Sequence, residues 1–339
     1  MQKIDRSLHL RSRTFLRADN CDVADLAAIC EVATDVTDYP LAATAEKGVL
    51  IYGCPTLAPR LSDPDFADAL MAEWADALAN GPGVIVLSGA EPDLAMIDRA
   101  SAIFRELIAR QNAAGTGGGD HFAKPGANDR LWNSLEKHCL ADPVNFARYY
   151  ANPFLALVSQ AWLGPYYQMT AQLNVVNPGG ASQSPHRDYH LGFQSADAVA
   201  RYPSHVHRFS PMLTLQGAIA HVDATIEAGP TLLLPHSQKY EPGYLATAVC
   251  QIRGRGSIGY HGGGFPKNIA SPFKPLRISA RRGLGLDVDF RALVCVSGTC
   301  GKRGFNPFVR RFFDNGLNFS GVFARYCFRG AGRGFGHFG

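Results

Sequence analysis

The hydrophobic and polar residues of the chain follow two different periods. Between residues 62 and 163, apolar residues recur every three or four positions, as in helices that bury one face. Ser62 and Asp63 provide the N-cap of the first of these helices, which ends near Asn80. The pattern predicts helices over residues 64–80, 91–114, 129–140 and 143–163, and buried strands over residues 48–53 and 84–87.

From residue 167 the pattern changes to short strands separated by turns. Polar and apolar residues alternate in the first of these strands. Gln172, Asn174 and Val176 share one face, whereas Leu173 and Val175 share the other. Longer apolar strands are expected over residues 212–219 and 231–234.

Helices followed by strands predict an α+β fold in which the helices pack against a β-sandwich or barrel. The apolar fraction of 46% is ordinary for a globular protein and sufficient for a core. We expect the main domain to cover residues 46–245. Residues 1–45 would form a lead-in segment, and residues 246–339 a C-terminal region of different composition.

The eight cysteines include no C-x-x-C pair and no compact disulfide framework. This spacing favours reduced thiols and a cytoplasmic location. No apolar run approaches the roughly 18 residues of a membrane span, so no membrane partner is expected. Residues 1–20 lack the apolar core of a secretory signal, and a mitochondrial presequence is an alternative against which Asp5 and Asp19 count.

Two H-x-D pairs are candidates for chemistry: His186 with Asp188, and His221 with Asp223. Residues two apart on an extended segment point the same way, so His186 and Asp188 can bind one metal ion. An imidazole and a carboxylate are two of the three ligands in the two-His-one-carboxylate site of non-haem Fe(II) oxygenases. We expect His221 instead to be a hydrogen-bonded core histidine, with Asp223 in a turn.

The first pair lies in a characteristic order of elements: a polar-faced strand, a Pro-Gly turn, Pro-His-x-Asp, a long apolar strand, and then Glu-x-Gly-Pro-Thr and Pro-x-Ser. In this order residues 45–245 resemble the phytanoyl-CoA dioxygenase family of iron- and 2-oxoglutarate-dependent oxygenases. The resemblance implies a double-stranded β-helix, a relative of the jelly roll, with N-terminal flanking helices. It also implies an enzyme with Fe(II) as cofactor and with 2-oxoglutarate and molecular oxygen as co-substrates. Such an enzyme hydroxylates a small organic substrate and releases succinate and CO2.

The resemblance assigns further residues to the site. His261, in a Tyr-His-Gly-Gly-Gly turn, would be the third metal ligand. Arg277 and Lys124 would bind the carboxylates of 2-oxoglutarate, although Lys124 is equally well explained as a solvated loop residue. Gln172 and Asn174 are candidates for contact with the co-substrate or the substrate; their alternative is a simple exposed polar face.

The net charge of +4 is unevenly distributed. Residues 1–241 hold 18 basic and 26 acidic residues, a net of −8, whereas residues 242–339 hold 15 basic and 3 acidic residues, a net of +12. After Leu245 the chain has no Glu and no Trp, but it has 12 of its 20 Phe residues. Three interpretations are open: a disordered basic tail that binds nucleic acid, a divergent β-rich completion of the barrel, or a shift of reading frame near Leu245.

Two alternatives to an active oxygenase are therefore compatible with the sequence. One is an inactive fold relative without a complete metal triad, because residues 251–260 lack the apolar pattern of a strand leading to His261. The other is a protein whose basic C-terminal region binds nucleic acid. The expected partners are a small-molecule substrate and molecular oxygen, and not nucleic acid.

Overall fold

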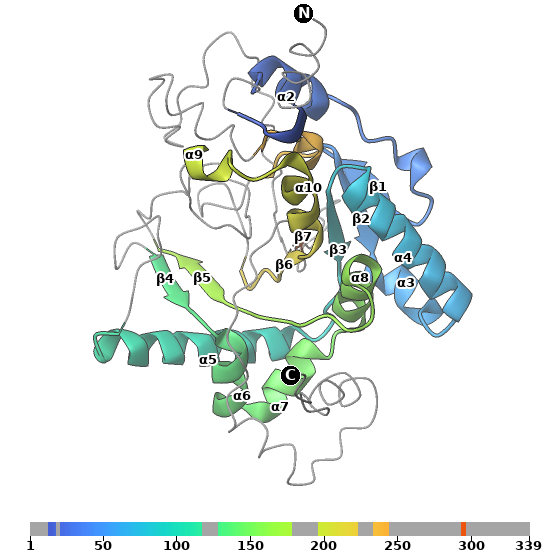
Figure 1. Cartoon of the computed structure of the whole chain (residues 1–339). Coiled ribbons are helices and arrows are strands. Elements are labelled where there is room, and N and C mark those ends of the chain that lie inside the picture. Colours follow the sequence, from blue (N-terminus) through green and yellow to red (C-terminus); the bar gives the residue numbers. More distant parts are fainter. Residues whose placement is uncertain are drawn as a thin grey trace, which may run out of the picture. The chain divides into compact units, whose positions relative to one another are not determined.

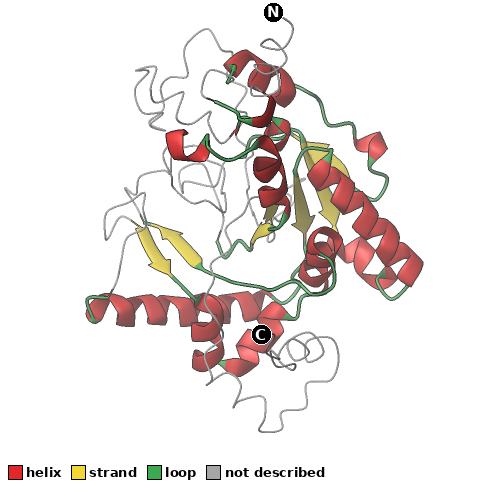
Figure 2. Cartoon of the chain, in the orientation of Figure 1, coloured by secondary structure: helices red, strands yellow, loops and turns green. Residues whose placement is uncertain are grey.

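A computed structural model of the chain describes residues 13–17, 21–116, 128–177, 196–222, 233–243 and 293–295 (Figures 1 and 2). Its α-helices are α2 (Val23–Cys30), α3 (Cys54–Leu57), α4 (Pro64–Ala79), α5 (Leu94–Ala113), α6 (Ser134–Ala141), α7 (Pro143–Tyr150), α8 (Pro153–Leu163), α9 (Ala196–Val199) and α10 (Ser204–Met212). Short 3-10 helices are η2 (Val36–Asp38), η3 (Ala58–Arg60) and η4 (Ser237–Lys239). The strands are β1 (Thr44–Glu46), β2 (Val49–Gly53), β3 (Val84–Ser88), β4 (Asn128–Leu131), β5 (Leu173–Val176), β6 (Gln216–Ala218) and β7 (Leu293–Cys295).

The larger sheet has five strands in the order β1-β2-β3-β7-β6. β2 and β3 are parallel, and the connection between them contains α4, whereas the other neighbouring strands are antiparallel. Leu50 of β2 is paired with Ile85 of β3, and both side chains are fully buried. Burial on both faces explains why these two strands are continuously apolar. The predicted strands over residues 48–53 and 84–87 are confirmed.

Helix α4 packs against this sheet and against α8, and it confirms the first predicted helix (Figure 1). The side chain of Asp63 accepts a hydrogen bond from the backbone at the helix N-terminus. Trp74 is fully buried and meets Tyr52 of β2 edge to face, with 5.8 Å between the ring centroids. The Tyr52 hydroxyl donates to the Glu73 carboxylate at 2.9 Å, and the same carboxylate accepts from the backbone N–H of Leu41. Glu73 thus connects the helix to the sheet and to the loop before β1.

A second core lies between α5, α6, α7 and the two-stranded sheet of β4 and β5. Phe104 of α5 is buried there, in edge-to-face contact with Tyr149 of α7. Leu131 of β4 is almost fully buried, and Leu173 and Val175 of β5 pack against the same cluster. The helix predicted over residues 91–114 and the strand predicted from residue 172 are both confirmed.

Two predicted helices are wrong in part. Residues 129–131, expected to begin a helix, belong to β4, which pairs with β5; this pairing partner is more than forty residues away and leaves no local pattern. The helix expected over residues 143–163 is divided into α7 and α8. Pro153 has no N–H to continue a helix, and the side chain of Asn152 accepts from the backbone N–H of Phe154 at 3.0 Å, so a new helix begins here.

The strand predicted over residues 212–219 is also wrong in part. Met212 ends α10, and only Gln216–Ala218 form β6. An apolar run of this length does not distinguish a strand from the end of a helix by its period alone. Of the strand expected over residues 231–234, residues 231 and 232 lie outside the described residues.

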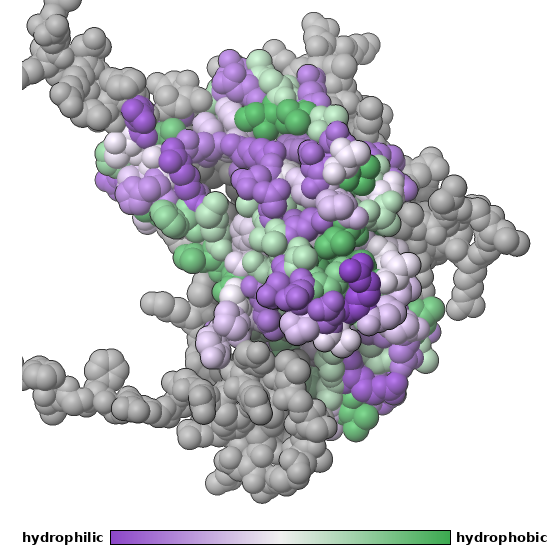
Figure 3. Space-filling view, turned by 90° about the vertical axis from the view of Figure 1, so that its right-hand side faces the viewer, coloured by the Kyte–Doolittle hydropathy of each residue, from purple (hydrophilic) through white to green (hydrophobic). Residues whose placement is uncertain are grey.

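The described part of the chain therefore has a mixed fold of helices and small sheets, and its strands do not close into a barrel. Polar residues cover much of the side shown in Figure 3, where apolar residues form small separate patches. None of the described helices is both long enough and apolar enough to cross a lipid bilayer. No disulfide joins Cys21, Cys30, Cys54 or Cys139, the cysteines whose side chains are described.

Residues 233–243 bring together segments that are far apart in the sequence. The Tyr240 hydroxyl accepts from the backbone N–H of Asp22 at 2.7 Å and donates to its carbonyl oxygen at 3.0 Å, which holds the start of α2. The backbone N–H of His236 donates to the carbonyl oxygen of Pro82 at 2.8 Å. The Gln238 amide donates to the carbonyl oxygen of Gly81 at 3.0 Å, beside the start of β3.

We predict that Gly83→Ala destabilises the protein by about 2 kcal/mol. Gly83 has φ +75°, which costs an alanine about 1 kcal/mol. A Cβ atom there would lie 2.2 Å from Cδ of Gln238, so the amide must move and lose its hydrogen bond to Gly81, worth about 1 kcal/mol. Urea unfolding measures the change.

Gly115→Ala is the matched control. Gly115 has φ +64°, but nothing lies within 4 Å of a Cβ atom built there, so only the backbone cost is expected. In a Gln238→Ala background the two alanine variants should cost the same. Equal costs in the wild-type background would show that packing of Gln238 against Gly83 contributes no stability.

Candidate functional site

Of the predicted site residues, the described part of the chain contains Gln172 and Asn174. Gln172 directly precedes β5 and Asn174 lies within it, and both are exposed while Leu173 between them is half-buried. The predicted alternation of faces is confirmed. The remaining predicted site residues lie outside the described residues; they are Lys124, His186, Asp188, His261 and Arg277.

Strand β4 forms the other half of this small sheet and places a cation beside the two amides. Arg130 is the register partner of Asn174, and its Nη1 donates to Oε1 of Gln172 at 3.4 Å. Its guanidinium carbon lies 5.0 Å from the ring centroid of Trp132, within the range of a cation–π contact. The sequence pattern does not predict Arg130 at this position, because a helix over residues 129–140 would not pair this residue with Asn174.

On the other face of the same sheet, hydrogen bonds to the side chain of Asp129 hold the edge of the sheet in place. Asp129 accepts a hydrogen bond from the Asn112 amide of α5 at 3.2 Å and from the Asn177 amide, just after β5, at 2.9 Å. These bonds hold the end of β5 to β4 and to α5. His186 follows Asn177 by nine residues in the sequence, so the segment that carries the predicted metal ligands starts from an anchored strand end.

His221, from the second H-x-D pair, is held in the second core. Ser101 donates to the carbonyl oxygen of Ile97 at 3.0 Å, so its hydroxyl oxygen accepts from Nδ1–H of His221 at 2.8 Å. Nε2 of His221 then accepts from the hydroxyl of Tyr149 at 2.7 Å. Both ring nitrogens are satisfied in the neutral form. His221 is the hydrogen-bonded core histidine that the sequence predicts; its neighbour Asp223 lies outside the described residues.

Burial keeps two histidines of this core neutral. It lowers the pKa of His221 to about 4, with a smaller contribution from His138. His138 is fully buried, and burial also lowers its pKa. Its Nε2–H donates to Oδ1 of Asn145 at 2.7 Å, and the Asn145 amide donates to the carbonyl oxygen of Met96. Neutral, hydrogen-bonded rings of this kind support the packing of α5 against α7.

Among the described residues there is no group of three His, Cys, Asp or Glu side chains that could hold a metal ion. The three predicted ligands all fall in segments that the structure does not describe. Near the predicted ligands in the sequence, the structure describes β4, β5 and the helical core against which these strands pack.

A family model described as phytanoyl-CoA dioxygenase (PhyH) matches residues 65–253, more than half of the chain. The chain belongs to the phytanoyl-CoA dioxygenase family. The match begins in α4 and includes both strands of the small sheet as well as the first H-x-D pair, His186 and Asp188. It ends before His261. Membership of this family of dioxygenases supports an enzyme of the oxidoreductase class. No curated protein and no solved structure matches the chain.

We predict that the free energy of unfolding of this family member decreases as the pH is lowered, because His221 takes up a proton. An unfolded histidine takes up a proton near pH 6.5, whereas folded His221 does so only near pH 4. Its contribution is complete above pH 6.5 and is lost as the pH falls toward 4, by up to about 3 kcal/mol. Urea unfolding of the wild type and of His221→Gln at several pH values between 7 and 4 measures this.

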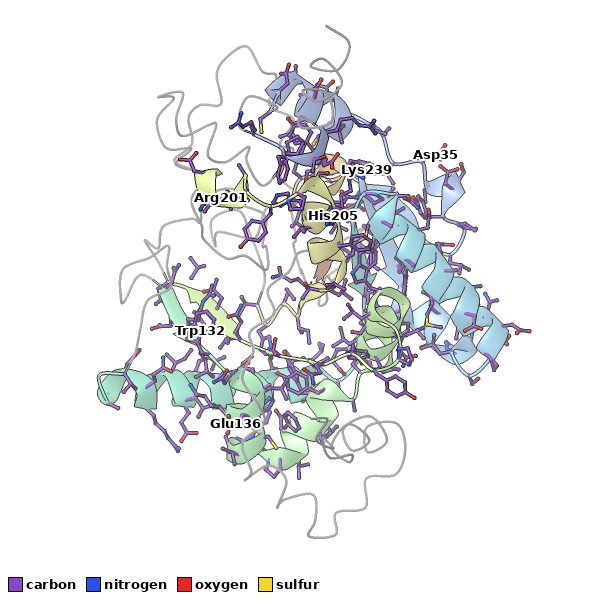
Figure 4. All side chains as sticks on the ribbon, in the orientation of Figure 1. Asp35, Trp132, Glu136, Arg201, His205 and Lys239 are labelled. Atoms are coloured by element: carbon purple, nitrogen blue, oxygen red, sulfur yellow. The ribbon has the colours of Figure 1, made fainter. Side chains whose placement is uncertain are left out.

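The two proteins should converge in stability as the pH falls, because protonation removes what the substitution has already removed. His205→Gln, at an exposed position of α10, is the control and should keep the wild-type dependence (Figure 4). A stability gap between wild type and His221→Gln that stays constant over this range would contradict the assignment.

Proposed function

We propose that the protein is an Fe(II)- and 2-oxoglutarate-dependent dioxygenase that hydroxylates a small organic substrate. The observation that carries this proposal is the family match over residues 65–253, which contains His186 and Asp188 in the segment that follows β5. The jelly-roll core that the family resemblance implies is part of the proposal. Molecular oxygen and 2-oxoglutarate would be the co-substrates.

The proposed metal ligands are His186, Asp188 and His261. Two imidazoles and one carboxylate suit ferrous iron and leave coordination positions for other molecules, which is the chemistry such a donor set is known for. Bound iron and 2-oxoglutarate would supply the oxidising power, with succinate and CO2 as co-products. The carboxylate of Asp188 favours hydroxylation, since the halogenating members of the family lack it.

In this proposal, residues of the chain bind the co-substrate and the substrate and orient them. The exposed amides of Gln172 and Asn174 can each donate and accept hydrogen bonds to a co-substrate or substrate oxygen. Lys124 and Arg277 are proposed to bind the carboxylates of 2-oxoglutarate by charge-assisted hydrogen bonds. The hydrogen-bonded core around His221 keeps α5 and α7 in place behind β4 and β5.

An inactive relative is the second candidate. It is favoured by the end of the family match at residue 253, which leaves His261 outside the matched residues. In this case His186 and Asp188 would be present without the third ligand. Iron would then bind weakly, and no succinate would form.

The test is succinate release by the purified full-length chain, titrated with one equivalent of Fe(II) in the presence of 2-oxoglutarate and air. The wild type should form succinate in an iron-dependent manner even without its own substrate. His186→Ala and Asp188→Ala should each reduce this by at least about a hundredfold, because each removes a direct ligand. His190→Ala, in the same segment, is the matched control and should retain the wild-type rate.

His261→Ala separates the two candidates. An active wild type with an inactive His261→Ala variant would support the complete triad. A wild type that binds iron but forms no succinate above the iron-free background would make the protein an inactive relative.

A further inference from the structure

His236 connects a lysine on one side of its ring to a threonine on the other. It is buried, and its backbone, at φ 65°, leads into η4, the 3-10 helix that contains Lys239 (Figure 4). Its Nε2 atom lies 3.0 Å from Oγ1 of Thr34, and its Nδ1 atom lies 3.0 Å from Nζ of Lys239. An amine, an imidazole and a hydroxyl are thus hydrogen-bonded in sequence. We call these three residues the Lys-His-Thr row.

The hydrogen bonds fix the tautomer of His236. The Thr34 hydroxyl donates to the carbonyl oxygen of Gly48 at 2.7 Å, so its oxygen accepts from Nε2–H of His236. Nδ1 then carries a lone pair, which accepts a hydrogen bond from Nζ of Lys239. Burial lowers the pKa of His236, with a smaller contribution from Lys239, so the ring is neutral at pH 7 and the lone pair is present.

The same surroundings favour the neutral amine of Lys239. Burial of its ammonium group lowers the pKa of Lys239, although the carboxylate of Asp76 in α4 opposes this. The neutral amine is the nucleophilic form, and desolvation is one way in which proteins activate a lysine. Lys239 as a whole remains exposed, so a reagent in solution can reach it. Nδ1 of His236 is in position to take the proton that the amine must lose when it forms a new bond.

The row also indicates which product would fit. An aldehyde would convert the amine into an imine, which in its uncharged form has no N–H left for His236. Carbon dioxide would give a carbamate, whose negative charge is unfavourable near Asp76. An acyl group gives an amide, which is neutral and keeps one N–H. That N–H can still donate to Nδ1 of His236, so acylation preserves the hydrogen bond of the unmodified lysine.

We propose that Lys239 is an acylation site that takes acyl groups from thioesters, with His236 as the base and Thr34 as a positioning residue. The lone pair of Nζ attacks the carbonyl carbon of the thioester and forms the C–N bond. The C–S bond breaks, and the sulfur leaves as a thiolate with the bonding electrons. The proton released from Nζ passes to Nδ1 of His236 and from there to the thiolate. No step uses iron or 2-oxoglutarate, so this inference goes beyond the proposed function and is independent of it.

The experiment treats the full-length chain at pH 7 with the acetyl thioester of N-acetylcysteamine, and peptide mass spectrometry follows the acetylation of each lysine with time. Lys137 of α6 is the control within the same molecule, because its Nζ donates to the amide oxygen of Gln111 at 3.4 Å and not to a base. A general base contributes roughly a hundredfold or more, so Lys239 should be acetylated at least about tenfold faster than Lys137. Equal rates for the two lysines would overturn the proposal.

His236→Asn tests the base. Asparagine tolerates the positive φ of this position, but its amide cannot take up the proton. In this variant the acetylation rate of Lys239 should fall to that of Lys137, whose own rate should not change. Thermal unfolding shows whether the variant is folded. If Lys239 keeps its wild-type rate in folded His236→Asn, the proposal is wrong.

Thr34→Val and Thr34→Ser keep the test decisive even if His236→Asn does not fold. Valine leaves Nε2–H of His236 without its acceptor, which frees the ring to adopt the other tautomer, with the proton on Nδ1. Acetylation of Lys239 should therefore slow several-fold in Thr34→Val and recover in Thr34→Ser, with Lys137 unchanged in both. Equal rates for Lys239 in the wild type and in both variants would remove the role of the row and overturn the proposal.

Discussion

Backbone pairing between β4 and β5 is the constraint on which the described part of the candidate site depends. A shift of the register by one residue would turn every side chain of one strand to the opposite face. Leu131, Leu173 and Val175 prevent such a shift, because they bury their side chains against the core of α5 to α7. The same register then places Arg130 beside Asn174. One register therefore determines both the face of the small sheet that packs on the helical core and the opposite face, which carries Arg130 and Asn174.

Much of the fold could be predicted where the pattern is local. The capped amphipathic helix α4, the long helix α5 and the buried strands β2 and β3 are specified by residues within each segment. The predictions failed where a distant partner decides the structure. β4 is a strand because β5 is available to pair with it, and the run from Met212 is shared between α10 and β6 by packing that no short window contains.

The candidate site could be predicted only in part for the same reason. The exposed face of Gln172 and Asn174 follows from simple alternation, and the assignment of His221 to the core follows from its apolar surroundings. Arg130 was missed because its role depends on a strand pairing. A useful signal was present: Arg130 and Trp132 have the spacing of neighbours on one strand face, and the apolar residue Leu131 lies between them.

The hydrogen bonds between Tyr240 and Asp22 have a consequence for folding during synthesis of the chain. Asp22 is synthesised 218 residues before its partner Tyr240. At 5 to 20 residues per second, that delay is roughly 10 to 40 s. During this interval α2 lacks the hydroxyl that holds its first residues, while β2, α4 and β3 are already available to assemble. Although α2 is translated before these elements, it would therefore be among the last of the described elements to dock.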